Sequence, residues 1–268
     1  MNRAVNPLAL AGRRIVVTRP AGQAEGLCAL IRRAGGEPLE IPALEIRDLA
    51  NLTPFFAAAD RLESFDWAIF VSRNAVRRAL ALLAGRPGGH LWPAHLRVAT
   101  VGSGSREELE AKGFAAVIAP PAGQSDSEAL LGLPEFNAVT GKRIVIFRGE
   151  GGRRLLGETL AARGAVVEHA ACYRRTLPEA GGAQLAVAWE GGPVDAILVS
   201  SGEGLANLLE MLGGEAPRRL AGTALFVPHP RVAQDAARRG IERTIVAGPG
   251  DAETAAALVA YFGGASYN

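Results

Sequence analysis

The residues best suited to chemistry lie just after short apolar runs, where a buried strand would end. These positions carry hydroxyls, glycines and arginines, with no pair of carboxylates and no nucleophile beside a general base. Such groups are typical of anion binding, and arginine binds carboxylates with two parallel hydrogen bonds. The candidate binding residues are Arg19, Ser72, Arg73, Ser103, Ser105, Arg148, Gly149, Ser200, Ser201, Gly202, His229 and Arg231.

Most of these positions also precede segments with helical periodicity. The first turn of a helix presents unpaired N–H groups and a partial positive charge, so it attracts anions. For any single serine, a simple N-cap is the better interpretation, because Ser is a preferred capping residue. Several such sites with arginines beside them, converging on one cleft, favour an anionic ligand over capping alone.

Two glycine-rich motifs and the cysteines and histidines point to no cofactor. The run 102–104 begins like a dinucleotide fingerprint, but Glu107 stands where the third glycine is needed. The run 149–152 lacks the Gly-Lys-Ser/Thr end of a phosphate loop. Cys28 and Cys172 have no CxxC partner, and the four histidines are scattered along the chain. We therefore expect neither a cofactor nor a metal.

Tyr173 differs from these sites because it carries a phenol. It follows the apolar run 166–171 at an expected crossing between domains, where Arg174 and Arg175 add positive charge. A tyrosine there could donate a proton or a hydrogen bond into a ligand cleft. The alternative, which spacing alone favours, is an aromatic residue packed at an interface with its hydroxyl in water.

The elements that must position these residues occur twice. The run 14–19 returns 129 positions later as 143–148, and the run opened by Asp66 returns as the run opened by Asp195. A repeat this long indicates a duplicated domain rather than a solenoid. Each copy alternates continuous apolar strands with amphipathic helical stretches, which indicates parallel sheets covered on both faces. We therefore predict an α/β protein with two similar open parallel-sheet lobes and a ligand cleft between them.

Length and composition agree with two ordinary domains. The chain has 268 residues, of which 49% are hydrophobic, enough for two cores. A net charge of +2 is too small to indicate a nucleic-acid-binding protein. No apolar run reaches the ~18 residues of a membrane span, and no signal peptide is evident before the first strand pattern. We expect a cytoplasmic protein with neither a nucleic-acid nor a membrane partner.

In their order and spacing, these motifs resemble uroporphyrinogen-III synthase along essentially the whole chain. The matching stretches are 17–20, 70–76, 101–105, 147–153, 172–175, 199–202 and 227–231. The Tyr-Arg step at Tyr173 and the Arg-Gly-Glu-Gly-Gly-Arg run from Arg148 weigh most. The resemblance implies a HemD-like fold of two flavodoxin-like halves joined by a two-stranded connector. Lobe one would hold residues 1–38 and 176–268 and lobe two residues 39–175, with crossings at 38–45 and 170–175.

The resemblance also implies an activity. The substrate would be hydroxymethylbilane, a linear tetrapyrrole that bears eight carboxylates. The enzyme would close it to uroporphyrinogen III, with inversion of ring D and loss of water, as a step of haem biosynthesis. It would be a monomeric, cofactor-independent lyase. Because the bilane closes unaided with ring D uninverted, the protein would act mainly by orienting a reactive substrate.

The resemblance assigns roles by position. Tyr173 would assist departure of the substrate's hydroxyl as a general acid or hydrogen-bond donor. Ser105 and Ser201 would bind carboxylates, and the turn from His229 to Arg231 replaces the Gly-x-Thr type of turn found in many members. Two rival hypotheses remain: a non-catalytic bilobed protein that closes on a small anion, and a phosphosugar-binding enzyme of the same architecture.

Overall fold

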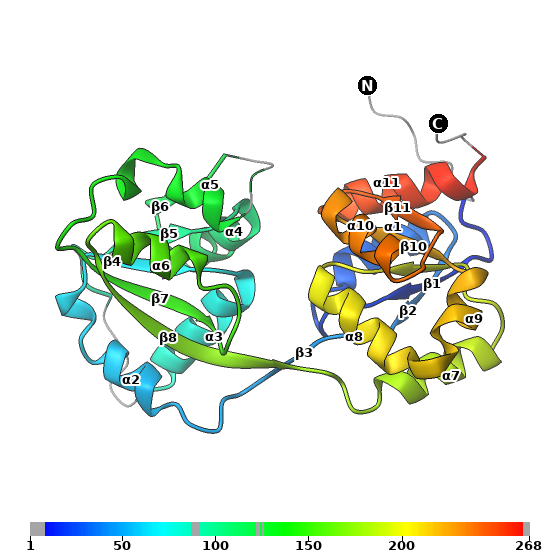
Figure 1. Cartoon of the computed structure of the whole chain (residues 1–268), viewed down its shortest axis with the longest axis horizontal. Coiled ribbons are helices and arrows are strands. Elements are labelled where there is room, and N and C mark those ends of the chain that lie inside the picture. The colour runs from blue at the N-terminus through cyan, green and yellow to red at the C-terminus, as the bar shows by residue number, and fades with distance from the viewer. Residues whose placement is uncertain (1–8, 87–91, 122–123, 125, 265–268) are drawn as a thin grey trace. The chain divides into compact units, whose positions relative to one another are not determined.

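The computed structural model describes residues 9–86, 92–121, 124 and 126–264. The chain divides into two units, which we call lobe one and lobe two. Lobe one consists of the stretch up to Glu45 together with the stretch from Thr176 onward, and lobe two is Ile46–Arg175. In Figure 1, lobe one is therefore coloured both blue and yellow to red, whereas lobe two is cyan to green.

Lobe one is built on a five-stranded parallel sheet in the order β11-β10-β9-β1-β2. Its strands are β1 (Arg14–Val17), β2 (Glu37–Glu40), β9 (Ala196–Leu198), β10 (Ala224–Val227) and β11 (Thr244–Val246). Its helices are α1 (Glu25–Arg33), α7 (Gly181–Glu190), α8 (Gly202–Leu212), α9 (Ala216–Ala221), α10 (Pro230–Arg238) and α11 (Asp251–Phe262), with the 3-10 turn η3 (Gly213–Glu215).

Both faces of this sheet are covered by helices, which explains why its strands are continuous apolar runs. Ile15 and Val17 of β1 pack in one core cluster with Leu27 of α1 and Leu258 of α11. Val16 points to the opposite face, because side chains alternate along a strand. It packs in a second cluster with residues of α7, α8 and α10.

Lobe two is built on a six-stranded sheet in the order β3-β8-β7-β4-β5-β6. Its strands are β3 (Glu45–Arg47), β4 (Trp67–Phe70), β5 (Arg97–Thr100), β6 (Val117–Ile118), β7 (Arg143–Gly149) and β8 (Val166–Thr176). Its helices are α2 (Thr53–Ala59), α3 (Arg73–Ala84), α4 (Ser103–Glu110), α5 (Ser127–Leu131) and α6 (Leu155–Ala162), with the 3-10 turns η1 (Leu62–Ser64) and η2 (Pro134–Phe136).

The core of lobe two has the same two-sided organisation. Phe70 and Phe147 stack, with 4.8 Å between ring centroids, in a cluster that includes residues of α2 and α3. Ile69 and Ile146, which alternate with them along β4 and β7, pack in another cluster with residues of α5 and α6. The predicted α/β fold with parallel sheets is thus confirmed in both lobes.

The duplication is visible in the topology of the sheets. Five strands of lobe one follow the flavodoxin-like order 2-1-3-4-5, and five strands of lobe two follow the same order when β7 and β8 are counted as its first and second strands. In lobe one, β1 and β2 come from the first copy of the repeat and the other three strands from the second. In lobe two, β7 and β8 come from the second copy, and β4, β5 and β6 from the first. Each lobe therefore combines two strands of one copy with three strands of the other.

Equivalent aspartates hold the exchanged strands together. Asp66, just before β4, accepts hydrogen bonds from the backbone N–H of Arg143 (2.8 Å) and from the ammonium of Lys142 (2.8 Å). Asp195, just before β9, accepts hydrogen bonds from the backbone N–H of Arg14 (2.9 Å) and from the guanidinium of Arg13 (2.7 Å). Each carboxylate therefore ties a strand of one copy to a strand of the other.

The first junction between the lobes lies further along the chain than predicted. β2 pairs with β1 through Glu40, and backbone hydrogen bonds continue from Ile41 to Val17 (3.1 Å) and from Ala43 to Thr18 (3.0 Å). Residues 39–45 therefore belong to lobe one, and the predicted boundary after residue 38 moves to residue 45. The chain crosses at β3, which is the neighbour of β8, the strand that leads back to lobe one.

Candidate functional site

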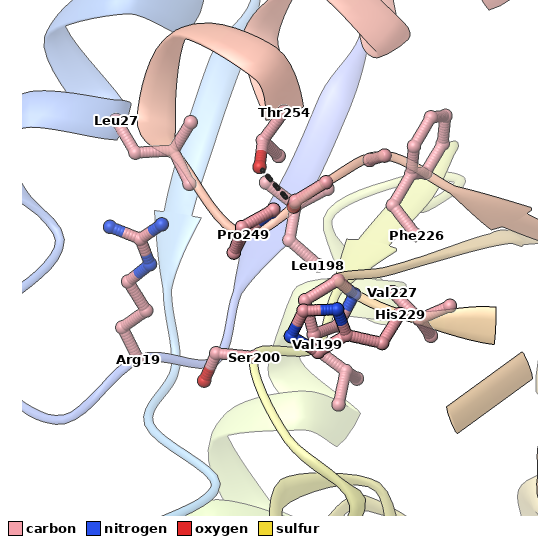
Figure 2. Close-up of a pocket in the computed structure, with 13 residues that line it drawn as sticks. Arg19, Leu27, Leu198, Val199, Ser200, Phe226, Val227, His229, Pro249 and Thr254 are labelled. Atoms are coloured by element: carbon pink, nitrogen blue, oxygen red, sulfur yellow. Dashed lines mark hydrogen bonds between the residues drawn. The ribbon is translucent and has the colours of Figure 1, made fainter. Parts of the chain in front are cut away.

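The carboxyl ends of the lobe one strands surround a small pocket (Figure 2). Its lining comes from the segments that follow β1, β9, β10 and β11, together with Leu27 of α1 and Thr254 of α11. Its volume is about 90 Å³, which suits a small anionic group with water. Three predicted binding residues line it, and Figure 2 shows Arg19 and His229 on opposite sides with Ser200 between them. The structure therefore brings Arg19, Ser200 and His229 together around one pocket.

The turn that leads into α11 forms the upper wall of this pocket. Gly248 has a φ of +87°, and a Cβ there would lie 2.7 Å from a carboxylate oxygen of Glu253. The Glu253 carboxylate accepts the backbone N–H of Gly250 (3.0 Å), and the Thr254 hydroxyl donates to the carbonyl of Gly250 (2.8 Å). Glycine at position 248 is required both by its conformation and by this close contact.

Arg19 carries a partner that sequence reasoning missed. Its guanidinium donates to a carboxylate oxygen of Asp251 at 2.5 Å, and its side chain is only 14% exposed. The positive charge of Arg19 is therefore already balanced by the protein. An acidic residue in the first turn of a helix is common because it interacts favourably with the helix dipole, so Asp251 carried no separate signal in the sequence.

Two of the predicted serines are N-caps. The Ser72 hydroxyl accepts the backbone N–H of Ala75 (3.0 Å) at the start of α3, and the Ser201 hydroxyl accepts that of Gly204 (3.0 Å) at the start of α8. The capping interpretation is confirmed for both. Gly202 occupies the first position of α8 and is exposed. These helix starts lie at the carboxyl edges of their sheets, with their first N–H groups at the same edge.

Tyr173 is buried in lobe two, with only 3% of its surface exposed. Its hydroxyl lies 3.1 Å from the Ser72 hydroxyl, and either oxygen can be the donor. The ring packs on Gly149, where a Cβ would approach it to 2.8 Å. A register shift at the end of β7 sets Gly149 opposite Tyr173. The interpretation of a phenol with its hydroxyl in water is therefore wrong, because the phenol is held between β7 and the start of α3.

A second group of predicted residues meets where α3 and α4 begin. The guanidinium of Arg73 lies against Gly104, where a Cβ would be 3.3 Å from its Nε. Ser105, in the first turn of α4, is 6% exposed, whereas Ser103 at the start of the helix is exposed. The sequence from Gly102 to Ser105 thus builds a helix start with an arginine beside it, and no dinucleotide fingerprint is needed to explain its glycines.

Arg148 is the next-to-last residue of β7, and its side chain turns back toward the loop that follows the strand. Its guanidinium donates to the carbonyl of Gly151 and, through Nε, to that of Gly149 (3.3 Å). Partial burial, together with the nearby charges of Arg175 and Arg154, lowers the pKa of Arg148. Partial burial and the charges of Arg148 and Arg154 likewise hold the pKa of His169 below its usual range. Several positive charges therefore lie near the end of β7.

The predicted residues thus fall into groups within each lobe. In lobe one, Arg19, Ser200 and His229 line the pocket, and the helix starts at Gly202 and near Arg231 belong to the same edge of the sheet. In lobe two, the groups are those around Tyr173, around the start of α4 and around Arg148, as described above. Within the described ranges, no cluster of three or more histidine, cysteine or carboxylate side chains could hold a metal ion. In the same part of the chain, no helix is long and apolar enough to cross a bilayer.

The fold and these groups define a class of protein. A duplicated α/β protein that collects hydroxyls, helix starts and arginines at the carboxyl edges of parallel sheets is suited to binding a small anionic molecule. A family model described as uroporphyrinogen-III synthase HemD matches residues 25–260. The chain belongs to this family, as the resemblance of its motifs predicted.

Individual relatives and structures agree with this assignment. The chain is 38% identical to the uroporphyrinogen-III synthase of Salmonella typhimurium over 201 residues, which cover 72% of this chain and 78% of that protein. It is 32% identical to the Escherichia coli protein of the same name over 198 residues, or 74% of this chain and 79% of that one.

Solved structures share the fold. A mutant uroporphyrinogen III synthase of Thermus thermophilus aligns with a TM-score of 0.63 at 18% identity, covering 93% of this chain and 97% of that one. The Helicobacter pylori uroporphyrinogen-III synthetase aligns with a TM-score of 0.61 at 15% identity, covering 93% and 99%. At these identities the likeness supports the fold rather than individual residues.

Proposed function

We propose that this protein closes hydroxymethylbilane to uroporphyrinogen III, with inversion of ring D and loss of water. The family match across residues 25–260 carries the proposal. The reaction would be that of a lyase that needs no cofactor, because the substrate itself loses a hydroxyl and supplies both reacting carbons. The protein then contributes orientation and hydrogen bonding, which can account for a large part of a rate enhancement.

In this proposal, Tyr173 assists the departure of the substrate's hydroxyl. The N–H of Ala75 donates to the Ser72 hydroxyl, which lies within hydrogen-bond distance of the phenol. When Ser72 donates onward to the phenol oxygen, the successive hydrogen bonds polarise one another. This arrangement would make the phenol a better hydrogen-bond donor or general acid.

The substrate carboxylates would be bound by hydroxyls, helix starts and cationic side chains of both lobes. Arg19 is the least suited of the predicted residues, because Asp251 already balances its charge. We therefore assign Arg19 chiefly to holding α11 against β1 and to shaping the pocket. The remaining groups that we propose for carboxylate binding are Ser72, Arg73, Ser103, Ser105, Arg148, Gly149, Ser200, Ser201, Gly202, His229 and Arg231.

The thiol next to Tyr173 is not in its nucleophilic form. The neighbouring thiol of Cys172 is buried, and burial raises its pKa to about 12. It donates to the carbonyl of Arg148 at 3.3 Å. A protonated, inward-facing thiol would not add to an electrophilic intermediate of the substrate, since the thiolate is the reactive form.

The decisive experiment is an assay with freshly prepared hydroxymethylbilane. The protein is mixed with the bilane, the product is oxidised, and the III and I isomers of uroporphyrin are separated and quantified. Formation of the III isomer above the protein-free control is the expected result. Formation of the I isomer alone would overturn the proposal and leave a non-catalytic anion-binding protein or a phosphosugar enzyme of the same architecture.

We further propose that the protein works in the cytoplasm as a monomer. The two cysteines, Cys28 and Cys172, are both free thiols and both buried, which fits a reducing compartment. Light scattering coupled to gel filtration should give the mass of one 27.9 kDa chain. A mass of two chains would contradict the monomer without affecting the proposed reaction.

A further inference from the structure

Three arginines of lobe two meet around the turn that follows β7. Gly152 lies in this turn with a φ of +83°. A Cβ placed on Gly152 would lie 3.0 Å from an Nη2 atom of Arg148 and 3.1 Å from that of Arg175. The two guanidinium groups therefore approach the same point from β7 and from the end of β8. Arg154, at the N-cap position of α6, is the third positive charge of this group.

The charge of Arg148 is not balanced by a carboxylate within the described part of the chain. Its guanidinium donates to the neutral carbonyls of Gly149 and Gly151. The adjacent Arg153, by contrast, donates to a carboxylate oxygen of Glu128 at 2.5 Å. A partly buried guanidinium whose hydrogen-bond partners are neutral carbonyls keeps its full positive charge, so it attracts an anion.

The internal duplication supplies a comparison for Arg148. Its equivalent in the first copy, 129 positions earlier, is Arg19. Arg19 lies just after β1, the strand of lobe one that is equivalent to β7, and there the carboxylate of Asp251 lies 2.5 Å from its guanidinium. At the same place in the fold, lobe one therefore has an arginine–carboxylate pair and lobe two has an arginine with other arginines beside it.

We propose that Arg148, Arg175 and Arg154 form a subsite that binds one carboxylate of the bilane, in the role that Asp251 has toward Arg19 in lobe one. The inference rests on the proposed function, since it takes its ligand from that reaction. A carboxylate can accept two parallel hydrogen bonds from a guanidinium. Gly151 and Gly152, which have no side chains, leave the approach to Arg148 open.

The test compares Arg148→Gln with Arg153→Gln in the full chain. Both remove one positive charge from the same loop, but Arg153 is already paired with Glu128. We expect Arg148→Gln to raise the KM for hydroxymethylbilane about 10- to 100-fold, the loss expected for a hydrogen bond between charged groups. Because this contact is made in both ground and transition states, kcat should change less than about threefold. Arg153→Gln should keep the wild-type KM.

Three further tests separate binding from folding. Uroporphyrin III, the stable octacarboxylate formed by oxidising the product, should bind to Arg148→Gln more weakly than to wild type in a fluorescence titration. Arg148→Lys should recover only part of the affinity, because lysine keeps the charge but loses the planar pair of donors. Arg154→Gln, a change at an exposed position, should raise KM by a smaller factor even if Arg148→Gln folds poorly.

The outcomes distinguish the subsite from the reaction. If wild type forms the III isomer and both Arg148→Gln and Arg154→Gln match Arg153→Gln in KM and in uroporphyrin affinity, the subsite does not exist. If wild type forms no III isomer, the proposed function fails, and uroporphyrin binding that still depends on Arg148 would support an anion site alone.

Discussion

The two lobes share one scaffold but place different groups at the same edge of it. Helices α3 and α8 occupy equivalent positions, and each begins with a serine cap, Ser72 and Ser201, with the same bond length of 3.0 Å. In lobe two the capping serine also contacts the phenol of Tyr173. The residue equivalent to Tyr173 in the first copy, 129 positions earlier, is Leu44. The two lobes thus have equivalent helix starts at α3 and α8, and the start of α3 has the phenol of Tyr173 beside it.

The arginines at the ends of the equivalent strands β1 and β7 also differ between the lobes. Arg19 is satisfied by a carboxylate of its own lobe, whereas Arg148 faces further arginines. Lobe one therefore offers a nearly balanced pocket of hydroxyl and imidazole groups, and lobe two offers a phenol and excess positive charge. We therefore propose that lobe two carries the chemistry and makes the stronger electrostatic contribution to binding.

Removing the Tyr173 hydroxyl should produce the largest loss in the rate of III-isomer formation. Tyr173→Phe keeps the ring that packs on Gly149 but loses the contact with Ser72. We expect the rate of III-isomer formation to fall about 10²-fold, as is typical for a lost proton-transfer group. Tyr261→Phe is the matched control, since that hydroxyl accepts a hydrogen bond from Arg243 in lobe one. A wild-type rate in Tyr173→Phe would mean that Tyr173 contributes packing and takes no part in the reaction.

The two serine caps allow a direct comparison of the lobes, with a smaller expected change in rate. Ser72→Ala and Ser201→Ala each remove one N-cap, so each should lower the free energy of unfolding by about 1 kcal/mol. Ser72→Ala also removes a hydrogen-bond partner of Tyr173, so its rate of III-isomer formation should fall further, by about 3- to 10-fold relative to Ser201→Ala. Urea unfolding and the isomer assay measure the two quantities separately. Equal rate losses would mean that the lobes do not differ in this respect.

The sequence predicted the parts of the structure that depend on local periodicity. The buried strands around Ile15, Ile69, Ile144 and Ile197 are continuous apolar runs, and each is followed by helix-forming residues. Strand ends and helix starts follow directly from such runs, so most candidate binding residues lie at the carboxyl edges of the two sheets. The pocket residues Arg19, Ser200 and His229 are the clearest case.

Contacts between distant segments were not predictable in the same way. Asp251 meets Arg19 across 232 positions, and the two are brought together only because the copies exchange strands. Arg148 and Arg175 converge over Gly152 because of the register of β7 and β8, which includes an irregularity at Gly149. The lobe boundary at residue 45 depended likewise on two backbone hydrogen bonds beyond β2, which leave no pattern in the sequence.

The smallest expected effect concerns Asp66, one of the two aspartates that join the exchanged strands. Its substitution tests whether the carboxylate charge contributes to the free energy of unfolding. The pKa of Asp66 is lowered by its hydrogen bonds from the Lys142 ammonium and the Arg143 backbone N–H. A carboxyl group whose pKa is lower in the folded state stabilises the fold above its unfolded pKa of ~3.9, and this stabilisation is lost as the pH falls through the folded value. Asp66→Asn should therefore cost about 1 kcal/mol at pH 7, a modest value because both side chains are partly exposed.

The pH dependence separates the charge of Asp66 from its geometry. Asparagine can still accept the N–H of Arg143, so the difference between wild type and Asp66→Asn should be constant from pH 7 to pH 5 and shrink toward pH 3 in urea unfolding. Asp48→Asn, in an exposed pair with Arg78, should show a smaller difference throughout. A difference between wild type and Asp66→Asn that persisted unchanged at pH 3 would mean that Asp66 joins the two copies through the shape of its hydrogen bonds, not through its charge.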